Sequence, residues 1–316
     1  MIRRLLPRPI KVLSRRLRTP PAVVPRAADL SPLSLKMDRI LEELGRIQGR
    51  QLEDIRGPIQ RHEFRVYSHA GEDGIIQFLI RTIALPTTTF VEFGVEDYRE
   101  ANTRFLALNN HWTGLVMDGS EANIGAIRSD PVLWNAGVTA RAAFITRENI
   151  NEVLIAAGIS GDIGLLSVDV DGNDYWIFDA ITAVSPAIAV VEYNHRFGPS
   201  RAVTIPYDPN FVRRRADSSW LCCGASLRAL VVAAERKGMS LVGCCSFGNN
   251  AFFVRTELLP PWLPALTAAD GYVRGTFRES MLIDGLESTL TPAEEIALVE
   301  EAELIDVEAA PNSVPR

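Results

Sequence analysis

The sequence contains few cysteines, and none has the spacing of a known metal or redox motif. Four of the 316 residues are cysteines, and they form two adjacent pairs, Cys222-Cys223 and Cys244-Cys245. Zinc sites and redox dithiols usually separate paired cysteines by two residues, and that spacing is absent. We therefore expect reduced thiols and a cytoplasmic location.

Long apolar runs are also missing, and so are acidic residues near the N-terminus. No apolar run reaches the roughly 18 residues that a membrane-spanning helix needs, and no signal-peptide pattern is present. Residues 1–28 contain eight basic residues and no acidic one. The rest of the chain has 25 basic and 39 acidic groups, a formal charge of −14. A body this acidic argues against a nucleic-acid-binding surface.

Residues 1–58 are expected to form an N-terminal extension that is separate from the main body of the chain. Ile10, Leu13 and Leu17 form a thin apolar stripe among basic residues. We expect this segment to be a disordered basic tail or to contact an anionic membrane surface peripherally.

A second apolar stripe in the extension predicts a helix over residues 35–56. Its apolar residues recur every three or four positions: Met37, Ile40, Leu41, Leu44 and Ile47. Such a stripe is buried in most proteins. It either pairs two subunits in a homodimer or packs on the body of the same chain, and the sequence alone favours neither.

A strand, a tight turn and a helix follow one another from Phe90. Residues 90–93 are mostly apolar, Gly94 breaks the strand, and a helix is expected over 100–109. In doubly wound α/β sheets this unit places the turn at the carboxyl end of the strand, where ligands bind. Gly94 has no Cβ, so its backbone can approach a ligand closely. Glu92 is costly to bury unless it has a partner.

A second predicted strand, residues 114–118, ends in an acid. Asp118 lies 24 residues after Gly94, close to the position from which this fold contacts the ribose hydroxyls of a nucleotide-like cofactor. The alternative is that Asp118 caps the helix that starts near Glu121. Ser120 can supply that cap equally well, which would leave Asp118 free for a ligand.

The fourth and fifth predicted strands end in the densest polar cluster of the chain. The strand over residues 165–168 is followed by three acids, and the strand over 187–191 is followed by an acid, an amide and a histidine. These residues are Asp169, Asp171, Asp174, Glu192, Asn194 and His195. Residues 196–221 then lack a regular period, and a loop of this length after the fifth strand is suited to be a lid.

Together these elements predict an α/β fold, a doubly wound, mostly parallel, Rossmann-like seven-stranded sheet. Strands over residues 241–245 and 251–255, joined through Gly248, predict a closing antiparallel hairpin. The expected division is an N-terminal extension (1–58), a Rossmann-like domain (59–258) and a C-terminal tail (259–316). In the tail, Thr291 and Glu294 predict a capped helix, and the acidic stretch from Glu294 to Glu308 is expected to be solvated.

Four segments together resemble the FkbM-type proteins related to class I S-adenosylmethionine-dependent methyltransferases. They are residues 67–76, 90–104, 166–176 and 191–194. The family's VDxGxxxG motif corresponds to Val91-Glu92-Phe93-Gly94, and its KxDxEG motif to Ser167-Val168-Asp169-Val170-Asp171-Gly172. The resemblance covers about residues 67–258. The chain departs from it where Val95, Glu96 and Asp97 replace further glycines of the loop.

The resemblance implies transfer of a methyl group from S-adenosylmethionine to an oxygen of a sugar, glycan or other small-molecule acceptor. Glu92, Gly94, Glu96, Asp118 and Asp169 would contact the cofactor. The candidate bases for the acceptor hydroxyl are Asp171 and His195. By analogy with metal-dependent O-methyltransferases, Asp171, Glu192 and Asn194 would hold Mg²⁺.

Two other functions compete with this interpretation. Asp169-Val170-Asp171 is a DxD pattern of the kind with which glycosyltransferases hold a metal against a nucleotide sugar, although it leaves Gly94 and Asp118 unexplained. A Rossmann-like scaffold without catalysis would explain the reduced glycine loop. A nicotinamide-dependent dehydrogenase is disfavoured because GxGxxG is missing.

Overall fold

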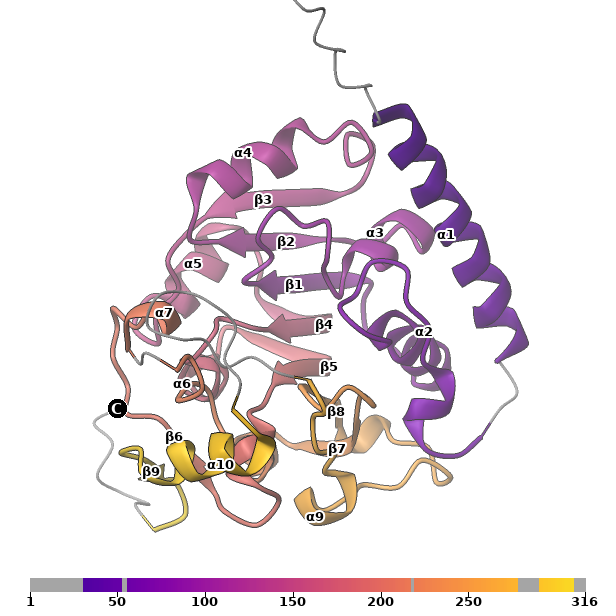
Figure 1. Cartoon of the computed structure of the whole chain (residues 1–316). Helices are drawn as coiled ribbons and strands as arrows, with labels where there is room; N and C mark the ends of the chain where they lie inside the picture. Colours follow the sequence, from indigo (N-terminus) through magenta and orange to yellow (C-terminus); the bar gives the residue numbers. More distant parts are fainter. Residues whose placement is uncertain (1–30, 53–55, 217–218, 278–289, 310–316) are drawn as a thin grey trace, which may run out of the picture.

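A computed structural model of the chain describes residues 31–52, 56–216, 219–277 and 290–309 (Figure 1). The expected basic segment at residues 10–17 lies outside these ranges. Within them, no helix combines the length and apolarity needed to cross a bilayer.

A seven-stranded sheet forms the centre of the molecule, in the order β3-β2-β1-β4-β5-β8-β7. The strands are β1 (Thr89–Phe93), β2 (Thr113–Asp118), β3 (Val138–Ala142), β4 (Gly161–Val168), β5 (Val184–Glu192), β7 (Met239–Cys244) and β8 (Asn250–Arg255). The first five are parallel, whereas β8 runs antiparallel to both β5 and β7. This arrangement confirms the predicted Rossmann-like sheet with its antiparallel hairpin.

Helices cover both faces of the sheet, which explains why its central strands are apolar throughout. The helices are α1 (Ser31–Gln51), α2 (Glu72–Thr82), α3 (Arg104–Asn109), α4 (Glu121–Ser129), α5 (Ile150–Ala156), α6 (Asp174–Ala180), α7 (Arg213–Ala216), α8 (Leu227–Arg236), α9 (Ala268–Gly271) and α10 (Pro292–Glu300), with short 3₁₀ turns at Ile59–His62, His195–Phe197 and Thr256–Leu258. One core packs α5, α6 and α8 against the sheet, and the other packs α2, α3 and α4.

Side chains of β1 alternate between the two faces of the sheet and therefore contribute to both hydrophobic cores. Phe90 packs with the α2 side, and Val91 and Phe93 pack with the α6 side. The parallel register places Val91 between Leu115 of β2 and Leu166 of β4. β1 is therefore buried between its two neighbours, and its carboxyl end opens next to theirs.

The C-terminal tail packs on the body, so the expectation that its acidic stretch is solvated is wrong for the centre of α10. Thr291 and Glu294 form the predicted capping box. Glu295 and Val299 are nevertheless buried, at 3% and 1% exposure. They cover the segment after β5, where β6 (Val203–Thr204) pairs antiparallel with β9 (Ile305–Asp306).

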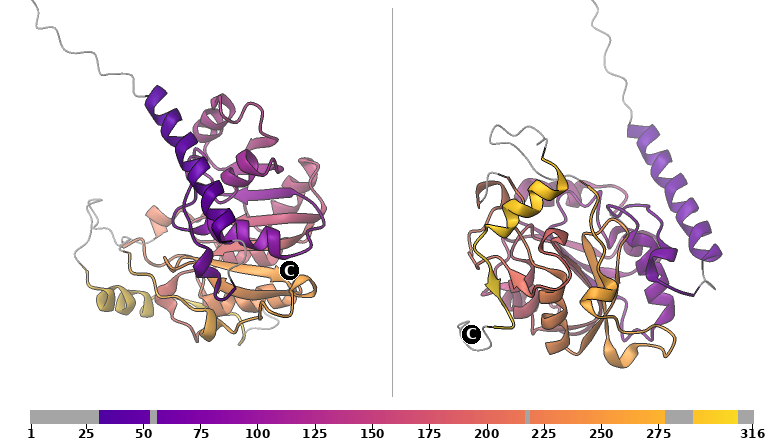
Figure 2. Two further views of the ribbon diagram at one scale, coloured as in Figure 1. Left: turned by 90° about the vertical axis from the view of Figure 1, so that its right-hand side faces the viewer. Right: turned by 60° about the horizontal axis from the view of Figure 1, so that its bottom comes forward.

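α1 lies along the outside of the molecule, as all three views show (Figures 1 and 2). Its predicted apolar stripe is exposed, so the alternative in which this stripe packs on the body is wrong.

Candidate active site at the carboxyl edge of the sheet

The turn after β1 depends on Gly94. Its φ is +70°, and a Cβ built there would lie 1.6 Å from the carbonyl oxygen of Asp169. The close approach predicted for Gly94 is therefore made first with the chain itself, since it lets the loops after β1 and β4 touch. Gly94 is also exposed, so its other side remains accessible at the sheet edge.

Glu92 holds the start of α3. Its side chain is 4% exposed and accepts hydrogen bonds from the backbone N–H groups of Asn102 at 2.8 Å and Thr103 at 3.0 Å, and from the Thr103 hydroxyl. Burial raises the pKa of Glu92. With its oxygens engaged inside the protein, Glu92 shapes the loop between β1 and α3.

Asp118 joins the ends of β1 and β2. Its Oδ1 accepts from the Ser120 backbone N–H at 2.8 Å and from Asn123 Nδ2 at 3.0 Å. Its Oδ2 accepts from the Glu96 backbone N–H at 3.0 Å. Ser120 caps α4 as predicted. Asp118 is therefore not free of protein contacts, although a carboxylate has about four acceptor positions and Asp118 is only half-buried.

The Glu96 side chain is exposed at the edge of this turn. The backbone φ angle of Glu96 is +47°, a conformation that is uncommon outside glycine. Such backbone strain often marks a functional loop. Glu96 therefore stands beside Asp118 with its carboxylate directed away from the core.

A buried carboxylate also shapes the loop after β4. Asp174 is fully buried, and its two oxygens accept from the backbone N–H groups of Val170 at 2.8 Å and Gly172 at 2.9 Å. The same turn places Asp171 at φ +58°. Asp174 thus fixes the backbone that presents the more exposed Asp171.

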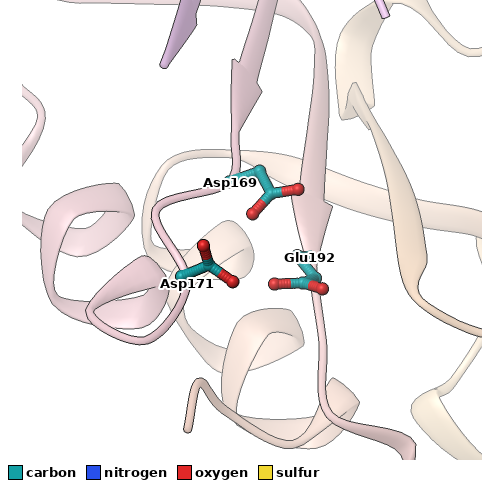
Figure 3. A group of neighbouring side chains, drawn as sticks. All are labelled: Asp169, Asp171 and Glu192. Atoms are coloured by element: carbon teal, nitrogen blue, oxygen red, sulfur yellow. The ribbon is translucent and has the colours of Figure 1, made fainter. Parts of the chain in front are cut away.

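Asp169, Asp171 and Glu192 form a three-carboxylate cluster (Figure 3). A ligand oxygen of each lies within 4.8 Å of the others. Burial and the neighbouring acids Asp171 and Asp174 raise the pKa of Asp169 well above its usual range. Arg213 Nη1 donates to Asp171 Oδ1 at 3.0 Å and supplies a positive charge on one side.

Asn194, a predicted metal ligand, makes hydrogen bonds with the long loop after β5. Its Nδ2 donates to the carbonyl oxygens of Leu221 at 2.8 Å and Cys223 at 3.0 Å, and its Oδ1 accepts from the Arg196 N–H at 3.1 Å. The amide therefore anchors the long loop after β5. Asp169, which the sequence assigned to the cofactor, takes the third position of the cluster.

His195 is buried next to the cluster rather than open to it. It is 6% exposed, and neither ring nitrogen has a hydrogen-bond partner among the described residues. Burial, together with Arg196 and Arg274, lowers its pKa to about 3. His195, Glu192 and Arg213 help to line a cavity of about 10 Å³, close to the size of one water molecule.

Two residues at this edge were not predicted from the sequence. Arg213 lies in the long loop after β5, where no periodicity distinguished it. Phe144 follows β3, is 51% exposed, and lies beside Gly119, where a Cβ would meet its ring at 3.4 Å. Phe144 is an aromatic residue near the carboxyl end of the third strand predicted from the sequence, over residues 140–145, and this position was the available signal.

Comparisons with known proteins identify similar folds and no family. No family model and no curated protein matches the chain. Among solved structures it is similar to an O-methyltransferase from Bacillus cereus in complex with SAH, with TM-score 0.38 and 16% identity over 71% of this chain and 93% of that one. A putative O-methyltransferase from Klebsiella pneumoniae matches with TM-score 0.37 and 14% identity over 69% and 97%.

A third similar structure is described as a C-methyltransferase rather than an O-methyltransferase. The geranyl diphosphate C-methyltransferase from Streptomyces coelicolor A3(2), in complex with Mg²⁺, geranyl diphosphate and S-adenosyl-L-homocysteine, matches with TM-score 0.34 and 13% identity over 64% and 80%. All three are described as methyltransferases, one of them as putative, and two of the three structures contain S-adenosylhomocysteine. At such identities and TM-scores these likenesses concern the fold and do not determine the activity.

Proposed function

We propose that this protein is an S-adenosylmethionine-dependent methyltransferase that methylates a hydroxyl group of a small-molecule or glycan acceptor. One juxtaposition carries the proposal. The glycine turn after β1, the acid after β2 and the carboxylates after β4 and β5 all lie at the same edge of a parallel sheet. In open α/β sheets this edge is where ligands bind.

The cofactor would lie across the ends of β1 and β2. Asp118 retains acceptor capacity for the ribose hydroxyls, and the exposed Gly94 permits close backbone approach. The Glu96 carboxylate could accept from the cofactor's ammonium group, whereas Glu92 is already engaged by α3. Phe144 offers an aromatic face beside Gly119 on which the adenine ring would stack.

The acceptor would lie nearer β4 and β5. When bound, S-adenosylmethionine supplies an electrophilic methyl group, so the main task of the protein is to align the acceptor oxygen with it. Asp171 is the more exposed carboxylate of the cluster and carries the proposed role of base. His195 is a weaker second candidate, because it is buried and a pKa of about 3 makes it a poor proton acceptor.

The three-carboxylate cluster fits a divalent cation. Carboxylate oxygens are the ligands that Mg²⁺ prefers, and the charges of Asp169, Asp171 and Glu192 are only partly balanced by Arg213. These three residues would hold the ion, and Arg213 would orient Asp171 toward it. A bound cation would also polarise an acceptor hydroxyl.

The first experiment is mass spectrometry of the purified protein for retained S-adenosylmethionine or its demethylated product, followed by calorimetric titration. Asp118→Ala should weaken cofactor binding about tenfold, because hydrogen bonds to a charged group are lost. Asn123→Ala is the matched control. It removes one internal hydrogen bond of Asp118 but keeps the carboxylate, so we expect near-normal binding.

Other outcomes would contradict the proposal. A thermal shift with UDP-sugars but none with S-adenosylmethionine would favour the glycosyltransferase interpretation. Binding of neither ligand would favour a non-catalytic scaffold. Equal affinity of the Asp118→Ala variant and the wild type would exclude Asp118 from the cofactor site.

A further inference from the structure

α1 turns its polar face toward the body and its apolar face toward solvent. Against the body lie Glu42, which accepts from the Tyr67 hydroxyl at 2.7 Å, and Arg46, which donates to Asn109 at 2.8 Å. Gly45 and Gly49 are buried on the same side. This is the reverse of an ordinary surface helix, whose apolar stripe faces the core.

The outward face carries a stripe of large apolar side chains. Their exposures are Leu33 55%, Met37 56%, Ile40 59%, Leu41 39%, Leu44 50% and Ile47 49%. Such a continuous exposed stripe on a soluble domain marks an interaction site. Because the opposite face of α1 is already docked, the helix is held in place without its apolar partner.

The spacing of this stripe is that of a coiled coil. Leu33, Met37, Ile40, Leu44 and Ile47 are separated by four, three, four and three residues, the a/d repeat of a two-stranded seam. With Met37 and Leu44 at a positions, Leu33, Ile40 and Ile47 take d. The g positions on the flank are then Lys36, Glu43 and Arg50.

We propose that the apolar face of α1 binds α1 of a second copy of this chain in an antiparallel coiled coil. In one two-fold register Met37 meets Ile40 of the second copy and Leu33 meets its Leu44. That register places Lys36 beside Glu43 of the second copy, and symmetry makes the contact twice. A parallel pairing would instead set Lys36 against Leu41 and Glu43 against Gln48, with no charge complementarity.

The charges on α1 also favour a second copy of the chain, rather than a membrane surface, as the partner of its apolar face. Glu43 lies directly beside the apolar seam, is exposed and also forms an ion pair with Arg46 of the same helix. An anionic bilayer would repel its carboxylate. In the antiparallel dimer the same carboxylate faces Lys36, which forms no ion pair within the described residues. The seam is short, so we expect a reversible dimer with a dissociation constant on the order of micromolar.

Sedimentation velocity of the full-length protein over a concentration series tests the proposal. The wild type should shift from monomer to dimer, and Ile40→Lys should stay monomeric. Ile155→Lys is the matched control. Ile155 is equally exposed, at 61%, but lies on α5, so this variant should still dimerise. Unchanged circular dichroism and melting temperature would show that Ile40→Lys leaves the fold intact.

Charge reversal tests the orientation. Lys36→Glu should weaken the dimer about tenfold, because two attractive contacts become repulsive. Adding Glu43→Lys should restore it. A Lys36→Glu variant that dimerises normally would overturn the antiparallel register. A wild type that is monomeric throughout, or that instead binds vesicles of phosphatidylcholine and phosphatidylserine through Ile40, would overturn the proposal.

Discussion

At the scale of single residues, Asp73 shows how one buried carboxylate organises a loop. It is 1% exposed, and its Oδ2 accepts from the backbone N–H groups of Val66, Tyr67 and Ser68 at 2.7 to 2.8 Å. The Ser68 hydroxyl adds a fourth hydrogen bond at 2.9 Å. Burial nevertheless raises the pKa of Asp73 to about 6. Its Oδ1 has no hydrogen-bond partner among the described residues.

This raised pKa predicts a pH dependence of stability. The folded state binds the proton of Asp73 more tightly than the unfolded state, whose carboxyl titrates near pH 3.8. The contribution of Asp73 to stability is therefore present below about pH 4 and is lost as pH rises through about 6, by up to about 3 kcal/mol. Asp73→Asn should remove this loss.

Urea denaturation of the wild type and Asp73→Asn at pH 4 and pH 7 measures the effect. The stability difference should move in favour of the variant at pH 7. A difference that does not change with pH would show that Asp73 has the same pKa in the folded and unfolded states.

Gly94 is the second residue whose replacement has a definite expectation. Gly94→Ala places a methyl group against the Asp169 carbonyl at a positive φ, so we expect a destabilisation of about 2 to 4 kcal/mol. Gly125→Ala is the control, because Gly125 lies in α4 with nothing within 4 Å of the new Cβ. That change should stabilise the protein slightly. Thermal unfolding would distinguish the two, and equal melting temperatures would contradict the expectation.

Some site residues could be predicted from the sequence and others could not, depending on which groups of the protein form hydrogen bonds with them in the fold. The positions of Gly94, Asp118 and Asp171 at strand ends followed from periodicity and spacing. The hydrogen bonds that occupy Glu92 and Asn194 did not, because their partners are backbone groups of loops without a sequence signature. The ligand roles of these two residues stay predictions, and the clustering of Asp169 with Asp171 and Glu192 could be recognised only in the folded chain.

At the scale of elements, α10 is attached through a buried ion pair. Arg196 Nε lies 3.0 Å from Glu295 Oε2, and the two side chains are 2% and 4% exposed. Removing one partner from such a pair leaves a buried charge and typically costs 3 to 5 kcal/mol. Glu295→Ala should therefore destabilise the docking of α10 by about 3 kcal/mol.

Amide hydrogen exchange of α10 is the direct measurement, since undocking raises exchange there before the body unfolds. Glu300→Ala, an exposed position on the same helix, should change little. Normal protection of α10 in Glu295→Ala would mean that the apolar contacts of Val299 suffice.

The capped start of α10 was predictable, and its docking was not. Thr291 and Glu294 act locally, so a few neighbouring residues determine the helix. Docking depends on Phe197, Val203 and Leu221, which lie in a segment without regular period. An acidic composition therefore gave the wrong expectation of a solvated tail.

At the scale of the whole molecule, the fold class was predictable because local patterns and connection rules agree. Alternating strands and helices imply a parallel sheet, and the Gly248 turn marked its antiparallel end. The outward orientation of the α1 stripe was not predictable, because a helical period identifies an apolar face without saying what covers it. The same limitation applies to the shape of any acceptor site, because that shape depends on loops.

The pairing of β6 with β9 has a consequence for biosynthesis. The loop that contains Arg213, which pairs with Asp171, follows β6, and β6 pairs with β9. Among the described elements β9 comes last in the sequence and is therefore synthesised last. A nascent chain can therefore complete its parallel sheet well before β6 and β9 pair. The acidic site at the sheet edge would therefore be completed only after β9 has been synthesised.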